Sequence, residues 1–189
     1  MMSNALRSFK EAFEIQGELG KLVDTATAES QLGPDWQLII GICDQVNVAK
    51  PEGIRDAVRS LRPRLKSTRI NVQLLSLTLL EALVKNCGPE LHLQIATKDF
   101  MGDLQYLAQP GNADGRVFRK VQQLIQAWGE AFKDMRRELP LFYDVYQSLR
   151  AQGTQFPPFD PSLAPSFVGA HNSSAGGSSS REARHTPTG

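Results

Sequence analysis

The sequence has few of the residues from which catalytic and metal sites are built. Its 189 residues include three histidines and two cysteines, and His171 and His185 lie in a polar C-terminal stretch. The third histidine, His92, sits between two leucines, where a packing or capping role is expected. No glycine-rich phosphate loop is present, because no glycine pair follows a strand and precedes a helix. The sequence therefore predicts a binding module with no cofactor and no metal, not an enzyme.

Net charge and long hydrophobic runs are lacking as well. The 21 Lys and Arg residues nearly balance the 20 Asp and Glu residues, which argues against a nucleic-acid-binding protein. The most apolar segment, residues 72–84, is too short and too polar to span a bilayer, and no signal peptide is expected. Cys43 and Cys87 lie in apolar helical patterns, as buried thiols of a reducing compartment do. We therefore expect a soluble cytoplasmic protein.

Alternating strand patterns are also missing, and apolar residues instead recur at three- and four-residue spacing. This pattern predicts an all-α fold, with helices at about 19–26, 34–46, 51–65, 68–86, 90–96, 98–108, 117–132 and 141–149. Pro63 is expected to disturb the last turn of its helix. Residues 68–86 are apolar nearly all round, which predicts a central helix surrounded by the others. Eight helices with short connections indicate a layered helical superhelix.

Composition divides the chain into three segments. Residues 1–16 are an N-terminal extension, in which Leu6, Phe9 and Phe13 predict an amphipathic helix that either packs on the body or dips into a lipid surface. Residues 17–157 form the folded body. Residues 158–189 are predicted to be a flexible Pro/Ser/Gly-rich tail. Such a tail is typical of a linker to a missing region or of a tether for short partner-binding motifs.

One candidate surface is basic. Four side chains fall along one helical face at three- and four-residue spacing: Arg55, Arg59, Arg62 and Lys66. This row is either a solvated charged face or a site for lipid headgroup phosphates.

The other candidate surface lies on the helix predicted to begin at Pro34 and Asp35. At about 100° per residue, its core face is made by Leu38, Ile39, Ile42, Cys43 and Val46. Trp36 and Ile40 extend this face sideways, beyond what a helix touching one layer of neighbours needs. Either another helix covers this edge, or the edge is exposed and anchors a partner.

Motifs over roughly residues 18–157 resemble those of VHS domains, in particular of the target-of-Myb, STAM and Hrs type of endosomal sorting adaptors. The resemblance rests on Asp35-Trp36 with Ile42-Cys43-Asp44, on residues 74–88, and on Asp99-Phe100, Trp128 and residues 149–157. It implies a right-handed ENTH/VHS-like superhelix of eight helices. It also implies a non-catalytic role in vesicle trafficking of cargo, peripheral on endosomal or Golgi membranes. The GAT domain that usually follows in this group is not found, which favours a missing C-terminal region that binds further trafficking proteins.

The resemblance also implies ligands. The family binds monoubiquitin weakly through a Trp and an aliphatic residue four positions later, which are Trp36 and Ile40 here. The GGA branch binds acidic-dileucine sorting signals, and only Lys98 and Arg150 can be carried over to that groove. Asp99 argues against such an acidic peptide because like charges repel. The alternative to ubiquitin is a phosphoinositide or membrane surface bound in the manner of ENTH domains through the basic row.

Overall fold

The computed structural model describes residues 17–165. The predicted N-terminal helix with Leu6, Phe9 and Phe13, and residues 166–189 of the predicted tail, lie outside the described residues. Within 17–165 the regular elements are eight α-helices and two short 3-10 helices. They are α2 (Glu18–Ala26), α3 (Trp36–Val48), α4 (Pro51–Leu65), α5 (Ile70–Asn86), α6 (Pro89–Ile95), α7 (Lys98–Leu107), α8 (Gly115–Ala131), η1 (Lys133–Met135), α9 (Pro140–Ala151) and η2 (Pro161–Leu163). The all-α prediction is confirmed.

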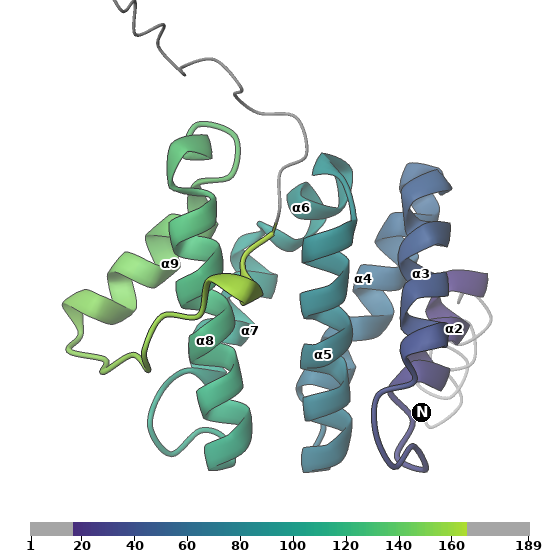
Figure 1. Ribbon diagram of the computed structural model, residues 1–189, viewed down its shortest axis with the longest axis horizontal. Helices are drawn as coiled ribbons and strands as arrows, with labels where there is room; N and C mark the ends of the chain where they lie inside the picture. The colour runs from purple at the N-terminus through teal and green to yellow at the C-terminus, as the bar shows by residue number, and fades with distance from the viewer. Residues whose placement is uncertain (1–16, 166–189) are drawn as a thin grey trace, which may run out of the picture.

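The helices are arranged in a row of packed layers with α5 in the middle (Figure 1). The layer formed by α2, α3 and α4 lies on one side of α5, and α8 with α9 lies on the other. Helix α5 contacts helices of both layers and also α6. Ten of its residues are buried, among them Leu77, Leu80 and Leu83. Since burying one such side chain contributes about 1.5–3 kcal/mol, this helix holds the two ends of the molecule together.

Three helices begin at a short polar side chain that caps their N-terminus. The Asp35 carboxylate accepts the backbone N–H of Leu38 at 3.0 Å and begins α3, while Thr97 and Asp114 cap α7 and α8 in the same way. Such caps satisfy N–H groups that have no partner inside the helix. Pro63 does not break α4, which continues to Leu65. A proline there forfeits one backbone hydrogen bond, and the buried Leu65 side chain still holds the last turn against the core.

A buried carboxylate joins α4 to the start of α2. Asp56 accepts the backbone N–H of Gly17 at 2.9 Å and that of Gly20 at 2.6 Å. It thereby caps α2 from another helix, a role that a side chain of α2 itself does not fill. A Cβ on Gly17 would lie 2.6 Å from the Asp56 carboxylate, so glycine is needed for this close approach.

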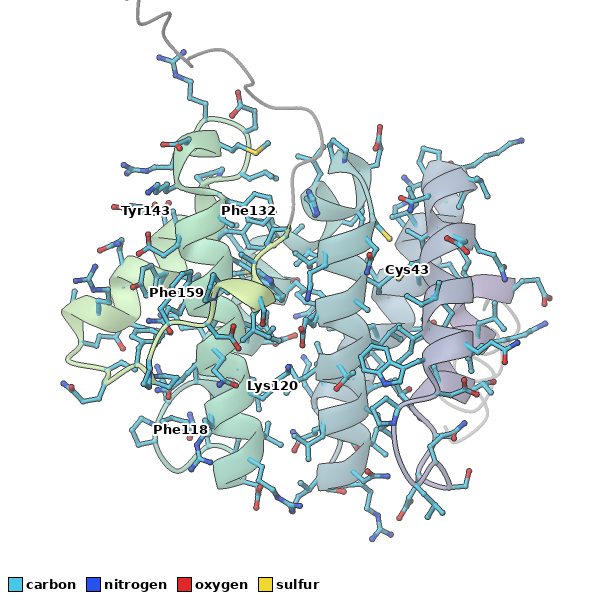
Figure 2. The ribbon with its side chains drawn as sticks, in the orientation of Figure 1. Cys43, Phe118, Lys120, Phe132, Tyr143 and Phe159 are labelled. Carbon is cyan, nitrogen blue, oxygen red and sulfur yellow. The ribbon has the colours of Figure 1, made fainter. Side chains whose placement is uncertain are left out.

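The thiols and His92 are packing groups, as the sequence predicts. Cys43 and Cys87 are buried and free, and the Cys87 thiol lies 3.7 Å from the Cys43 carbonyl oxygen. Its hydrogen bond with the Cys43 thiol, reinforced by burial, raises the pKa of Cys87. The buried His92 ring meets Phe132 edge-on at 5.0 Å, and Phe132 stacks on Phe142 at 4.4 Å. Figure 2 shows Phe132 inside the upper part of the molecule.

The chain stays packed beyond residue 157, where the sequence analysis places the start of a flexible tail. Residues 158–165 include η2, which contacts α8, and Pro165 is buried. Periodicity does not reveal this contact, because a proline-rich segment has no helical or strand pattern to read.

We expect His92 to make the protein less stable as the pH falls below about 6.5. Burial lowers the pKa of His92 from its ordinary value of 6.5, and Nε2 lies 2.9 Å from the Val84 carbonyl oxygen, to which a neutral ring donates. The unfolded chain then binds a proton that the folded chain excludes, so the free energy of unfolding falls with pH from about 6.5 down to the folded pKa.

Urea unfolding of the wild type and of His92→Gln at several pH values between about 7.5 and 5.5 measures this effect. Glutamine keeps an N–H donor for Val84 but does not titrate, so the variant should lose less stability on acidification. Equal losses in the two proteins would contradict the assignment.

Candidate functional site at the exposed edge of α3

The outer edge of α3 carries a tryptophan and an isoleucine on successive turns. Trp36 is 58% exposed and Ile40 is 46% exposed, whereas Ile39 and Ile42 on the same helix are buried. Residues four apart lie on one face of a helix, so the two side chains form one apolar patch, which we call the α3 edge. Gln37 and Asp44, both exposed, flank it. Within residues 17–165 no other helix covers this edge, so both side chains are exposed.

The position of α3 in the row explains this exposure. Helix α3 packs against α2, α4 and α5, and it stands at one end of the molecule (Figure 1). Its core face is therefore covered from one side, and residues 17–165 leave Trp36 and Ile40 in solvent. No side chain of residues 17–165 covers this apolar surface. Apolar patches that stay exposed to solvent often mark interaction surfaces.

Other exposed apolar side chains in residues 17–165 stand singly. They are Leu32, Val48, Leu93, Tyr106 and Phe159, and isolated apolar residues of this kind are normal on protein surfaces. Leu32 differs from the others because it lies in the loop that leads into α3 and is fully exposed. The sequence does not point to Leu32, because a single apolar residue beside glycine and proline has no periodicity.

Each member of the basic row has an acidic partner. Arg55 pairs with Glu52 and Arg59 pairs with Asp56, both at 2.9 Å. Arg62 bonds Asp103 of α7 and reaches Asp99 at 3.3 Å. Lys66 pairs with Asp103 at 3.0 Å. Two of these carboxylates, Asp99 and Asp103, come from α7, so the spacing within α4 alone does not reveal them.

The pKa shifts agree with this pairing. Burial alone would raise the pKa of Asp103, but hydrogen bonds from Arg62 and Lys66 outweigh burial, and the pKa lies below its usual value. The hydrogen bond with Asp103 raises the pKa of Arg62. Both pKa shifts show that the ion pairs favour the charged forms of Asp103 and Arg62. This part of the basic row therefore links α4 to α7.

Lys98 and Arg150, the predicted sorting-signal pair, lie in different surroundings. Lys98 lines a groove of about 1180 Å³ between α2, α4, α6 and α7, together with all four members of the basic row. Arg150 lies near the end of α9, with its guanidinium 5.6 Å from the centre of the Tyr146 ring on the same helix. No described contact joins the two residues.

Clusters of three or more His, Cys, Asp or Glu side chains that could hold a metal ion do not occur among residues 17–165. In the same range, no helix has the length and apolar character needed to cross a membrane.

Comparison with known proteins places the chain in a class. The sequence model of the VHS domain matches residues 14–153, so the chain belongs to the VHS domain family. Its relatives include "TOM1-like protein 6" of Arabidopsis thaliana, which is 39% identical over 143 residues, covering 76% of this chain and 21% of that protein. "TOM1-like protein 2" of Mus musculus is 37% identical over 145 residues, covering 75% of this chain and 28% of that protein.

A solved structure agrees with these relatives. The VHS and FYVE tandem domains of Hrs, described as a protein involved in membrane trafficking and signal transduction, match with a TM-score of 0.67 and 27% identity. The match covers 79% of this chain and 67% of that one. The predicted fold and the resemblance to the target-of-Myb, STAM and Hrs type are thereby confirmed. The chain spans between a fifth and a third of the TOM1-like relatives named here.

Alanine substitutions of Ile39 and Ile40 test whether the α3 edge contributes to stability. We expect Ile40→Ala to change the free energy of unfolding by less than about 1 kcal/mol, because nearly half of the residue's surface already lies in solvent. Ile39→Ala should cost about 2–5 kcal/mol, because it leaves a cavity in the core. Urea unfolding of both variants measures the difference. A loss at Ile40 as large as that at Ile39 would mean that the edge serves packing.

Proposed function

We propose that this chain is a non-catalytic adaptor module in membrane trafficking and that it binds ubiquitin or ubiquitinated cargo through the α3 edge. The observation that carries the proposal is the exposure of Trp36 and Ile40 on successive turns of α3. These are the positions to which the VHS resemblance assigns ubiquitin contact. The description of Hrs as a membrane-trafficking protein supports the adaptor role.

The chemistry of the edge suits a shallow apolar partner. A tryptophan supplies a broad flat surface, and an adjacent branched aliphatic side chain extends it, while Gln37 and Asp44 offer polar contacts at the rim. The patch is small compared with the roughly 800 Å² per partner of a standard stable interface. Binding to a single ubiquitin should therefore be weak, and strong capture requires several ubiquitins or additional binding modules.

Titration of the ¹⁵N-labelled chain with ubiquitin tests the proposal. We expect amide shifts centred on α3 and on the Trp36 indole N–H, without a general change of the spectrum. Trp36→Ala and Ile40→Asp should each weaken binding by at least about 30-fold, as loss of a central anchor does.

Val48→Asp is the matched control for this titration. Val48 is an exposed apolar residue of the same helix, and it lies about 12 Å from Ile40 along the axis. This variant should bind ubiquitin as the wild type does. Shifts that map away from α3, no shifts at millimolar ubiquitin, or normal binding by Ile40→Asp would each overturn the proposal.

A phosphoinositide or membrane surface is the second candidate ligand, favoured by the groove that Arg55, Arg59, Arg62, Lys66 and Lys98 line. Acidic side chains also line this groove, and every member of the basic row is paired. A phosphate would have to replace existing ion pairs, so we rank this ligand below ubiquitin. The acidic-dileucine signal ranks lower still, because Asp99 stands beside Lys98 and Arg150 lies elsewhere.

The wider setting of the proposal follows from the relatives. We propose that the protein acts at the cytoplasmic side of endosomal or Golgi membranes, as a peripheral component. Because the chain spans only part of its TOM1-like relatives, we also propose that further trafficking partners bind a region beyond this chain. No nucleic-acid partner is proposed.

A further inference from the structure

The chain after α9 turns back over the body as an extended strap, which we define as residues 154–165. It leaves α9 through Gly153, whose φ of +83° favours glycine, and the Thr154 N–H donates to the Leu149 carbonyl at 3.1 Å. The strap then crosses α8 toward α5 and ends in η2 (Figure 1). The VHS model matches residues 14–153, and the strap follows this match directly.

The strap is seated by a few separate contacts. The Phe156 ring meets Tyr146 of α9 edge-on at 5.1 Å, Leu163 packs against the core, and Pro165 is buried. Lys85 of α5 donates to the Ser162 carbonyl at 2.7 Å. This is the one hydrogen bond that joins the strap to α5 or α8 among the described residues. Phe159 is 47% exposed.

Two lysines next to the strap favour an acidic residue at its centre. Glu81 of α5 bonds Lys120 of α8 and lies 3.6 Å from Lys85, so two lysines share one carboxylate at this face. Asp160 supplies the second negative charge. Hydrogen bonds from Ser162, helped by the charges of Lys85 and Lys120, hold its pKa below the usual value. Figure 2 shows Lys120 between α8 and α5, below the strap that carries Phe159.

The strap therefore has the features of a bound peptide. It is extended up to η2 and contains four prolines in residues 156–165. Beyond Thr154, its backbone-to-backbone hydrogen bonds lie within the strap, from Leu163 to Asp160 and from Ala164 to Pro161. Prolines restrict the free segment and so lower the entropy lost on binding, which is one reason why proline-rich segments are common peptide ligands.

We propose that the face formed by α5 and α8 is a peptide-binding groove, held in cis by the strap, which accepts from a partner protein an extended Asp-Pro-x-Leu type segment. In the strap these positions are held by Asp160, whose carboxylate accepts the Ser162 N–H at 2.9 Å, by Pro161 at the start of η2, and by the partly buried Leu163, which packs against the core. The tether of a few residues gives the strap an effective concentration in the millimolar range. A partner segment must therefore be stronger, or presented in several copies, to replace it.

The test uses the full 189-residue chain and a fluorescent synthetic peptide with the sequence of residues 154–165. In the double variant Asp160→Lys/Leu163→Asp the strap is weakened and the groove is freed. We expect this variant to bind the peptide at least about tenfold more tightly than the wild type. Adding Lys85→Ala should reduce that binding by about tenfold, whereas adding Lys50→Ala, at an exposed lysine outside the groove, should not.

Two further measurements keep the proposal falsifiable. Circular dichroism and thermal unfolding establish that the double variant is folded, and excess peptide added to the ¹⁵N-labelled wild type should shift the amides of residues 156–165 and of α5 and α8. A folded double variant that binds no better than the wild type, or binding that ignores Lys85→Ala, would overturn the proposal. The ubiquitin titration reports on α3 and is independent of either result.

Discussion

The burial of α5 is the constraint on which the rest of the structure depends. Its leucines face α3 and α4 on one side and α8 on the other, so neither layer is complete without it. A helix that is apolar nearly all round is stable in water only when it is surrounded. The outer helices are therefore free to be amphipathic, and what they leave uncovered is available for binding.

Two faces of the molecule follow from this arrangement and have opposite characters. At the end formed by α3, the row simply stops, and Trp36 and Ile40 stay in solvent. At the face of α5 and α8, the chain covers the groove with its own residues, through Leu163 and Ser162. One surface is exposed to solvent, whereas the other is covered by the chain itself.

The basic row illustrates how tertiary contacts change the meaning of a sequence pattern. Arg55, Arg59, Arg62 and Lys66 form a positively charged stripe when α4 is considered alone. In the folded protein Asp103 and Asp99 of α7 approach Arg62 from about 40 residues away in the chain, within the range where opposite charges attract strongly. The stripe is thereby converted into a link between helices, and its capacity to hold a phosphate is reduced.

The sequence by itself determined the helices, the central position of α5 and the surplus apolar edge, because all three are periodicities written into neighbouring residues. It also carried the family motifs on which the proposed ubiquitin contact at Trp36 and Ile40 rests. Tertiary structure alone decided which side of α3 is covered, which carboxylates neutralise the basic row, and that residues 158–165 fold back. These depend on partners far apart in the chain, such as Lys85 and Ser162, 77 residues apart, and no local pattern encodes such pairs.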